Sequence, residues 1–399
     1  MSSNSYFSAQ EAAHELNISV ATLYAYVSRG LVRSEATPGK TKAKRYNAAD
    51  IKKQKQKQDY RHHPGQAAQE SLRLGMPVLD SGITLIEDGQ LYYRGQNVLE
   101  LATTRSFEEV ATFLWNGSFA ADQLFPPVPV PPCKTNQPIE NLSPVELFQV
   151  HLPVMAAEDL AGYDGSAAGL QRTGARILHF LTQIATEQHE IESIASALQR
   201  AWAPDNPEAL QGIEAALILC ADHELNVSAF TARCIASAGS TLYQVVLGGL
   251  SALQGVKHGG HAIRVQAMLE EVQGDVAAKM KKLIKRGEDP PGFWQPLYPN
   301  GDPRGRKLLE LADELAIKPT PLLEAQQAAE FVTKNLARYP NLDFGLVTLC
   351  RALGLPEQAS ITLFALGRVS GWIAHALEQY ETDQLIRPRA RYVGEMPEN

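Results

Sequence analysis

Two histidines occur in surroundings that suit the binding of a small polar ligand. His223 lies in a run of polar residues, 222–226, that directly follows an apolar helical stretch at residues 215–220. Because polar side chains are costly to bury unless each finds a partner, His223 is either a hydrogen-bonded structural residue or a ligand-binding one. His258 precedes two glycines, which let the backbone approach a ligand closely. Taken alone, these residues leave both alternatives open.

Three arginines near turns or glycines are candidates for binding carboxylates: Arg304, Arg368 and Arg387. A planar guanidinium group donates two parallel hydrogen bonds to a carboxylate, so such a set is a natural clamp for a small polycarboxylate. Ordinary surface ion pairing is the commoner role for any single arginine. The arginines therefore add weight only in combination with the histidines.

The composition is that of an ordinary globular protein with room for two or three domains, since 399 residues are 44% hydrophobic and 20% charged. Its four cysteines lie far apart without a CxxC pair, which suits a reducing cytoplasm. No apolar run approaches the ~18 residues of a membrane span, and the N-terminus lacks the pattern of a signal peptide. We expect a cytoplasmic protein without a membrane partner or a metal ion.

The first 63 residues differ in charge from the rest of the chain. They hold 11 Lys and Arg against 5 Asp and Glu, a net charge of +6, whereas the remaining residues carry −13. A short helix with Ser8 as its N-cap is predicted at residues 6–16, and a second helix with Ser19 as its N-cap at residues 20–29. The asymmetry of charge marks this segment as a separate unit.

Two further features follow these helices. Gly30 is placed to end the second helix, and the turn residues 37–40 lie between two short basic segments, which predicts a β-hairpin or wing. A third helix is expected near residues 48–51. With the stretch at residues 22–31 as its most specific part, this unit resembles the winged helix-turn-helix of MerR-like regulators.

The resemblance to MerR-like regulators implies a domain at residues 1–58, followed by a polar linker at residues 59–73. Such a module with a basic wing binds duplex DNA mainly through phosphate contacts. However, the second helix carries only one basic residue, Arg29, and a module of this kind can equally dock another protein.

The rest of the chain is predicted to be mainly α-helical. Residues 79–95 alternate in a way that predicts a small β-hairpin, and Ser106 with Glu109 has the pattern of a capping box at a helix start. The proline-rich residues 126–132 cannot be helical. Residues 144–380 consist of apolar-periodic segments of 10–20 residues separated by Gly, Pro or Asn.

Several motifs, in order, resemble the citrate synthase family over about residues 74–396. They are the hairpin with Leu91-Tyr92-Tyr93-Arg94-Gly95, Phe107-Glu108-Glu109-Val110, the two histidine motifs, Asp302-Pro303-Arg304, Pro340-Asn341-Leu342-Asp343-Phe344, the stretch 367–375, and Arg387-Pro388-Arg389. The resemblance implies a large helical domain at residues 74–263 and 364–399, a small domain at residues 264–363, and a homodimer.

The resemblance also implies the roles of the reacting groups. His223 would bind oxaloacetate, His258 would polarise the thioester carbonyl of acetyl-CoA, and Asp343 would remove its methyl proton. A thioester α-proton is a weak acid, so a carboxylate base works only if the developing enolate oxygen meets a hydrogen-bond donor at the same moment.

The remaining roles concern binding. Arg304 and Arg368 would hold the carboxylates of oxaloacetate, and Arg387 would reach into the site of the neighbouring subunit. Gly292 and Phe293 would belong to the loop that binds coenzyme A. The resemblance implies no permanently bound cofactor, because acetyl-CoA or another acyl-CoA is a substrate.

One loop departs from the pattern of the family. Gln295 occupies the position of a second active-site histidine, Trp294 that of a glycine and Pro296 that of an arginine. A glutamine amide donates a hydrogen bond but cannot deliver a proton or carry charge. If Gln295 gave no help, the loss of one such donor would lower the rate on the order of 10²–10³-fold.

Two functions are consistent with these residues. The first is a citrate-synthase-type acyltransferase with a reduced rate, favoured by His258 and Asp343. The second is a non-catalytic regulator derived from citrate synthase, which binds a metabolite in the former active site and DNA through its N-terminal unit. Gln295 and the basic N-terminus favour this second function.

Overall fold

The computed structural model describes residues 6–36, 44–48, 50–51, 54–55, 79–125, 141–189 and 191–397. The chain divides into two compact units, Met1–Asp80 and Ser81–Asn399, and each is a body of its own. Three predicted features lie outside the described residues: the turn at 37–40, the linker at 59–73 and the proline-rich segment at 126–132.

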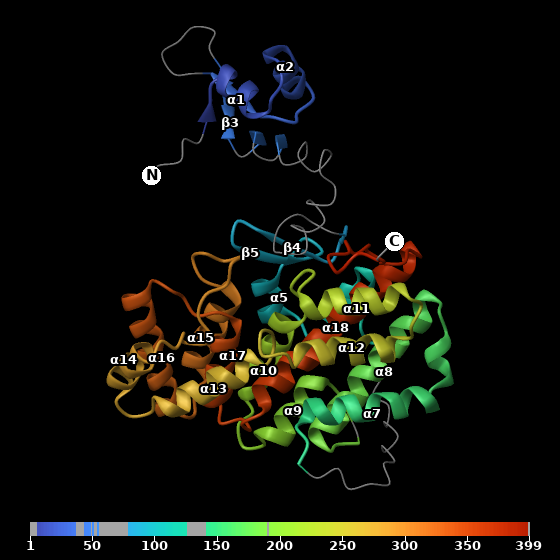
Figure 1. The fold of residues 1–399 in the computed structure, drawn as a ribbon. Helices are drawn as coiled ribbons and strands as arrows, with labels where there is room; N and C mark the ends of the chain where they lie inside the picture. Colours follow the sequence, from blue (N-terminus) through green and yellow to red (C-terminus); the bar gives the residue numbers. More distant parts are fainter. Residues whose placement is uncertain are drawn as a thin grey trace. The chain divides into compact units, whose positions relative to one another are not determined.

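The first unit consists of short helices and a three-stranded antiparallel sheet (Figure 1). Its elements are β1 (Tyr6–Phe7), α1 (Ala9–Glu15), α2 (Val20–Ser28), β2 (Ser34–Ala36) and β3 (Lys44–Asn47), with the strand order β1-β3-β2. Their apolar side chains form a small core of Ala12, Leu16, Leu23, Val32, Tyr46 and Ile51. The unit thus has two consecutive helices followed by the antiparallel strand pair β2 and β3, whereas the winged helix-turn-helix and kinship with MerR-like regulators stay predictions.

Both predicted N-caps are confirmed. Ser8 and Glu11 form a capping box at the start of α1, and the Ser19 hydroxyl accepts a hydrogen bond from the Thr22 backbone N–H at 3.1 Å. Gly30 follows α2 with a φ of 71°, a left-handed conformation that ends a helix at little cost to glycine.

The predicted start of the first helix at Tyr6 is wrong. Tyr6 pairs with Asn47 of β3, so the segment before Ser8 is a strand. The extended backbone of Ser8 separates this strand from α1. Ala48 and Ile51 are helical, as predicted for the third helix.

The second unit begins with the predicted β-hairpin. Strands β4 (Thr84–Glu87) and β5 (Gln90–Tyr93) pair antiparallel through a two-residue loop, and β6 (Gln96–Asn97) adds to β5. Asp88 and Gly89 have φ angles of 50° and 74°. Positive φ at both loop residues is the requirement of a type I′ turn, whose twist matches that of the paired strands.

The remainder of this unit is helical, and the capping box of Ser106 and Glu109 at the start of α6 is confirmed. The helices are α5 (Val98–Thr104), α6 (Phe107–Asn116), α7 (Pro144–Glu158), η1 (Leu160–Tyr163), α8 (Ala167–Thr186), α9 (Ile194–Trp202), α10 (Ala209–Cys220), α11 (Val227–Ser237), α12 (Leu242–Leu253), α13 (His261–Glu271), α14 (Val276–Lys285), α15 (Pro303–Leu315), α16 (Pro319–Leu336), α17 (Leu342–Ala352) and α18 (Ala359–Thr382).

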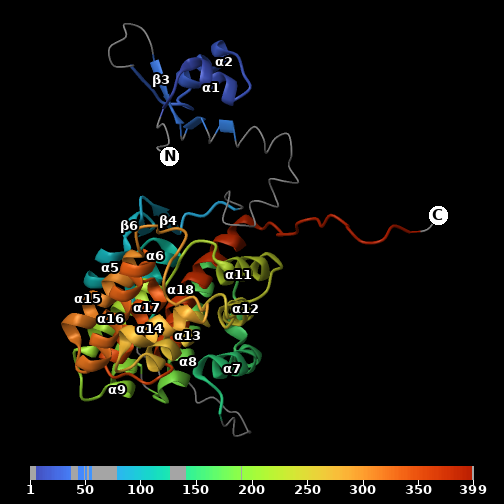
Figure 2. The ribbon, with the colours of Figure 1, turned by 60° about the vertical axis from the view of Figure 1, so that its left-hand side comes forward.

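Helix α18 is the central element of the larger core. It runs through the middle of this unit (Figure 2) and packs against α6, α8, α10, α11 and α12. Nearly all of its residues are buried. Gly367 and Gly371 let α18 approach α10 closely, because a Cβ atom at these positions would lie 2.5 Å and 2.2 Å from the carbonyl oxygens of Leu217 and Ala221. This approach brings one face of α18 to the end of α10, where His223 follows.

A second apolar cluster lies among α13, α14, α16 and α17, which Figure 1 shows gathered on one side of this unit. Val265, Met268, Met280, Val332 and Phe344 belong to it. The loop that leads from α14 to α15 joins this cluster through Phe293, whose ring centroid is 4.7 Å from that of Phe344.

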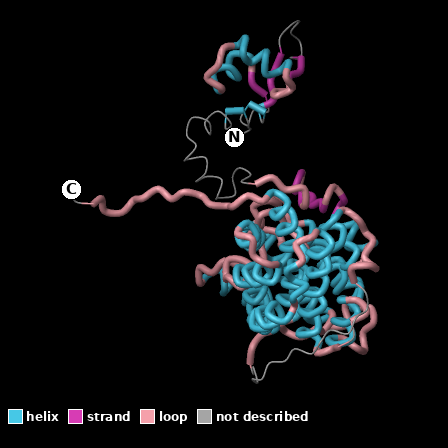
Figure 3. Tube along the Cα trace, turned by 90° about the vertical axis from the view of Figure 1, so that its right-hand side faces the viewer, coloured by secondary structure: helices cyan, strands magenta, loops and turns pink. Residues whose placement is uncertain are grey.

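Beyond α18 the chain has no regular secondary structure up to residue 397 and is mostly exposed. Figure 3 shows this C-terminal segment as an extended tube. Within the described part of the chain, none of the helices has both the length and the apolar character needed to span a bilayer.

Candidate active site

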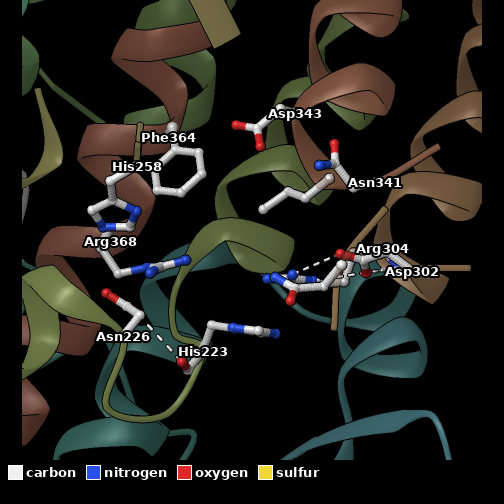
Figure 4. Close-up of a pocket in the computed structure, with 11 residues that line it drawn as sticks. His223, Asn226, His258, Asp302, Arg304, Asn341, Asp343, Phe364 and Arg368 are labelled. Atoms are coloured by element: carbon white, nitrogen blue, oxygen red, sulfur yellow. Dashed lines mark hydrogen bonds and ion pairs between the residues drawn. The ribbon is translucent and has the colours of Figure 1, made fainter. Parts of the chain in front are cut away.

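Side chains from six segments surround one pocket (Figure 4). The segments are the loop before α11, the loop before α13, the loop before α15, the starts of α15 and α17, and the middle of α18. The lining residues are His223, Asn226, His258, Gln295, Asp302, Arg304, Asn341, Leu342, Asp343, Phe364 and Arg368. The structure therefore brings together six of the nine predicted site residues.

Three helices begin at this pocket. Asn226, Asp302 and Asn341 are the N-caps of α11, α15 and α17, and each side chain accepts a hydrogen bond from the backbone of the helix that it caps. The N-terminus of a helix carries a partial positive charge. Three such termini at one pocket favour an anionic ligand.

His223 lies at a sharp turn between α10 and α11. The next residue, Glu224, has a φ of 51°, and its backbone N–H donates to the buried carboxylate of Asp222 at 3.1 Å. Asp222 also accepts from the hydroxyl of Thr84 at 2.5 Å, which ties the turn to β4. These contacts direct the His223 ring into the pocket, where Figure 4 shows it reaching toward Arg304.

The His223 imidazole is neutral at physiological pH. Burial holds its pKa well below the ordinary value, and the nearby Arg304, Arg368 and His258 lower the pKa further. Its Nε2 lies 3.0 Å from the hydroxyl of Tyr298.

His258 is held by the start of α11. Its Nε2 is 2.8 Å from the Ser228 hydroxyl, which is also 2.8 Å from Oδ1 of Asn226. The following Gly259 has no room for a side chain, because a Cβ there would lie 2.7 Å from the side chain of Leu253. Burial, followed by the charge of Arg368, lowers the pKa of His258 to about 4.

The two pocket arginines have different partners. Arg304 forms a two-fold hydrogen bond with Asp302, from Nε at 3.0 Å and from Nη2 at 2.7 Å, while its buried Nη1 has no partner among the described residues. Arg368 donates from Nε to the carbonyl oxygen of Cys220 at 2.7 Å. Each side chain thus keeps donors free for a ligand.

Their electrostatics differ accordingly. Burial alone would lower the pKa of Arg304, but the ion pair with Asp302 outweighs burial and raises it. For Arg368, burial dominates and lowers the pKa. A buried cation without a paired anion is costly, so an anionic ligand at Arg368 would remove part of that cost.

Asp343 lies in the first turn of α17, two residues after the N-cap Asn341. Its Oδ1 is shielded from solvent and has no hydrogen-bond partner among the described residues. Burial raises the pKa of this carboxyl group to about 7, although Arg304 and Arg368 act to lower it. An unpaired carboxylate with a pKa near neutrality is suited to accept a proton.

Gln295 lines the pocket with a half-buried side chain. Its Oε1 accepts a hydrogen bond from the Leu297 backbone N–H at 3.4 Å. Among the described residues no partner is recorded for the amide nitrogen of Gln295, so this nitrogen can donate to a ligand. The preceding Trp294 is 60% exposed and has a φ of 80°, a conformation that is rare for a bulky residue.

The other three predicted residues are not among those that line the pocket as described. Gly292, with a φ of 84°, accepts a backbone hydrogen bond from Asn341 at 2.9 Å, and Phe293 packs into the smaller apolar cluster. Arg387 lies exposed in the C-terminal segment.

Sequence reasoning missed several residues of the site. Asn226 and Asn341 precede helices in the way that N-caps do, and this signal could have marked them. Phe364 carried no signal that separates it from other apolar residues of α18. Ser228 and Tyr298, which contact the two histidines, became visible only through the tertiary structure.

The arrangement defines a class of site: a pocket in a helical fold where two arginines and three helix N-termini meet, and where a carboxyl group with a raised pKa lies beside two histidines with lowered pKa values. No group of three or more His, Cys, Asp or Glu side chains suited to a metal ion occurs in the part of the chain that the structure describes. The chain belongs to the citrate synthase family, since the model for the C-terminal domain of citrate synthase matches residues 72–128 and 133–389.

Individual relatives agree with this assignment. Citrate synthase 2 of Bacillus subtilis (strain 168) is 29% identical over 356 residues, which cover 80% of this chain and 94% of that protein. The crystal structure of citrate synthase from Thermotoga maritima MSB8 superposes with a TM-score of 0.68 at 27% identity, covering 82% of this chain and 96% of that one.

A third relative carries bound ligands. The citrate synthase of the thermophilic archaeon Thermoplasma acidophilum, solved as a ternary complex with carboxymethyl coenzyme A and oxaloacetate, superposes with a TM-score of 0.70 at 25% identity. The alignment covers 81% of this chain and 96% of that chain. The predicted family and the predicted mainly helical fold are confirmed.

Proposed function

We propose that the protein is an enzyme that condenses acetyl-CoA, or another acyl-CoA, with oxaloacetate and releases coenzyme A. The observation that carries this proposal is the single pocket that unites Asp343 with two histidines and two arginines. The relative with carboxymethyl coenzyme A and oxaloacetate supports this choice of ligands. Both compounds are substrates, so the reaction needs no permanently bound cofactor.

Oxaloacetate is a dianion, and the pocket offers hydrogen-bond donors and positive potential. In our proposal Arg368 and the free Nη1 of Arg304 bind its carboxylates, and His223 donates a hydrogen bond to it. The helix N-termini at Asn226 and Asn341 add to the attraction. Binding of the anion compensates the buried charge of Arg368.

The carbon–carbon bond forms in two linked steps. Asp343 takes a proton from the α-carbon of the acyl group, while His258 donates a hydrogen bond to the thioester oxygen as the enolate develops. The enolate carbon then attacks the ketone carbon of oxaloacetate, and water hydrolyses the thioester. For His258 to present Nδ1–H, the Ser228 hydroxyl has to turn its hydrogen from Oδ1 of Asn226, to which it donates at 2.8 Å, to Nε2 of His258, which is equally near.

The ketone oxygen of oxaloacetate becomes an alkoxide during the attack. We infer that the amide of Gln295 donates to this oxygen, since its Oε1 is engaged by Leu297. An amide supplies no proton, so the rate should be reduced relative to an enzyme with an imidazole here. Gln295→His, combined with Trp294→Gly and Pro296→Arg, should raise the rate up to about 10²-fold. An unchanged or lower rate with an intact fold would mean that the loop serves a different acceptor.

We propose further that the subunits form a homodimer in which Arg387 of one subunit completes the site of the other. The exposure of Arg387 on the C-terminal segment is compatible with such a reach.

The proposed large domain comprises residues 74–263 and 364–399, and the small domain residues 264–363. The smaller apolar cluster supports this division, because most of its members fall within residues 264–363. Gly292 and Phe293 would shape the coenzyme A side of the pocket.

Thiol release tests the function directly. Purified protein should release coenzyme A from acetyl-CoA only when oxaloacetate is present, and Asp343→Ala should abolish the release. Asp313→Ala serves as a matched control, since Asp313 is exposed on α15 and its recorded contact is with Gln326. If acetyl-, propionyl- and longer acyl-CoA all fail to release thiol at high protein concentration, the enzyme proposal is wrong.

A second proposal concerns the N-terminal unit, residues 1–58. Its two consecutive helices, its wing strand and the charge of +6 over residues 1–63 support binding to duplex DNA, and a dimer would favour a two-fold-symmetric site. Arg33 and Arg45 form ion pairs with Asp50 and Glu35, which weakens the case for a strong phosphate contact.

Mobility shift and footprinting on DNA that flanks its own gene test this proposal. Binding should weaken steeply with salt, because phosphate contacts release counterions. Absence of binding above the non-specific level at low salt, with and without oxaloacetate or acyl-CoA, would favour a protein-docking role for this unit and would count against the regulator hypothesis.

A further inference from the structure

Nε2 of each histidine in the pocket lies within hydrogen-bond distance of a side-chain hydroxyl group. The two hydroxyls differ in the number of groups to which they can donate their hydrogen. The Ser228 hydroxyl donates to Oδ1 of Asn226 at 2.8 Å and also lies 2.8 Å from Nε2 of His258, so two groups compete for its hydrogen. The Tyr298 hydroxyl lies 3.0 Å from His223, and the structure records no second side-chain or backbone acceptor for it among the described residues. Its hydrogen is therefore available to His223 alone.

Tyr298 acts from behind the pocket. Its side chain is 2% exposed and does not belong to the residues that line the pocket as described. The ring centroids of Tyr298 and His223 are 5.6 Å apart, and the guanidinium of Arg304 lies 5.7 Å from the Tyr298 ring. The phenol thus packs between two proposed acceptor-binding residues without a contact to the acceptor itself.

The protonation states limit the possible hydrogen bonds. Burial raises the pKa of Tyr298 to about 12, so the phenol keeps its proton. His223 is neutral for the reasons given above, so it has one N–H and one bare nitrogen. If Nε2 carried the hydrogen, Nδ1 would face an anion with a lone pair. If the phenol donates to Nε2, Nδ1 carries the hydrogen and can donate to an acceptor oxygen.

We propose that Tyr298 is a positioning residue that holds His223 in the tautomer with its hydrogen on Nδ1, ready to bind a carboxylate or ketone oxygen. The acceptor-binding part of this inference rests on the proposed function, whereas the tautomer is a property of the free protein. Because His223 and Tyr298 are 75 residues apart in the sequence, only the tertiary structure brings them into contact.

Nitrogen-15 NMR of histidine-labelled full-length protein measures the tautomer without any substrate. His223, assigned through His223→Gln, should show a protonated Nδ1 and a bare Nε2 at pH 7.5. In Tyr298→Phe the signals should move toward a mixture of the two tautomers. A wild-type His223 with its hydrogen on Nε2 would overturn the proposal, whether or not the protein turns over acyl-CoA.

Titration calorimetry with oxaloacetate adds the functional readout. Tyr298→Phe should raise the Kd for oxaloacetate about 10-fold, in line with the loss of one hydrogen bond of about 1.4 kcal/mol. It should leave the KM for acetyl-CoA unchanged.

Tyr243→Phe is the matched control, since Tyr243 is equally buried but its hydroxyl donates to Asp159, away from the pocket. Its Kd should equal that of the wild type. Equal oxaloacetate affinity in wild type and Tyr298→Phe refutes the positioning role. If the wild type binds no oxaloacetate, the proposed function fails and the NMR result still decides the tautomer.

Discussion

Replacement of Asp343 by Asn should inactivate the protein and stabilise its fold at the same time. The carboxyl group is held in a pocket where burial raises its pKa from 3.8 to about 7, and its Oδ1 has no partner among the described residues. The folded protein therefore disfavours the charged form that the proposed reaction requires. An asparagine has nearly the same shape and no charge, so it removes this cost.

The size of the effect follows from the pKa difference. Each pKa unit corresponds to about 1.4 kcal/mol, so the ionised carboxylate costs at most about 4 kcal/mol in the free energy of unfolding. The rest of the side chain is only partly covered and faces a pocket that admits water. Hydration lowers the cost, and we expect a gain of about 2 kcal/mol for Asp343→Asn at pH 8.

The size of this stability gain depends on pH in a defined window. Between pH 4 and pH 7 the unfolded chain has lost the Asp343 proton while the folded chain still holds it. The wild type therefore loses stability as the pH rises through this window, and the loss is complete above pH 7. Because Asn does not titrate, the advantage of Asp343→Asn should be near zero at pH 4 and full at pH 8.

Urea denaturation at pH 4, 6 and 8 measures this advantage, with Asp313→Asn as an exposed control that should change little. The same gain at all three pH values, or a loss of stability at pH 8, would refute the reasoning.

In the active enzyme kcat/KM should rise with pH to a plateau above about 7, because the base must be deprotonated. The variant should lose about 10²–10⁴-fold in rate.

Two further variants probe backbone strain beside Gln295 and the burial of a carboxyl group in the larger core. Trp294→Gly should raise the free energy of unfolding by about 1 kcal/mol, because glycine adopts the positive φ of this position without strain. Trp294→Phe keeps the strain and should leave the free energy of unfolding unchanged, so equal melting temperatures for the two variants would contradict the prediction. Glu214→Gln should stabilise the folded protein at pH 9 but not at pH 4, because burial and then Glu108 raise the pKa of Glu214 to about 8. The wild type therefore loses stability as the pH rises toward that value, whereas the glutamine does not titrate. A gain in melting temperature that is independent of pH would disprove this prediction.

Local interactions made much of the fold predictable from the sequence. Helix caps are formed by Ser8, Ser19 and Ser106 through hydrogen bonds to residues three positions ahead. A contact over so few residues can be predicted from the local sequence alone. The same rule applied to Asn226 and Asn341 would have marked them as the starts of α11 and α17, whereas their place at the pocket comes from the tertiary structure. Tyr6 shows its limit, because the strand there depends on a partner 41 residues away.

The membership of the pocket was also largely predictable, because the order of the motifs along the chain resembles one family. His223, His258 and Asp343 line one pocket, as that resemblance implies. The sequence also marked Gln295 as a departure, since the type of side chain alone decides whether a proton can be delivered.

The chemistry of those side chains was decided by the tertiary structure. The raised pKa of Asp343 follows from burial, which outweighs the opposing charges of Arg304 and Arg368. The lowered pKa of His258 follows from burial and then from Arg368, which a distant helix brings to the same pocket. The hydroxyl of Tyr298 meets His223 only because the loop before α15 folds over the end of α10. Desolvation and electrostatic coupling depend on distances in space, and no local pattern of residues contains those distances.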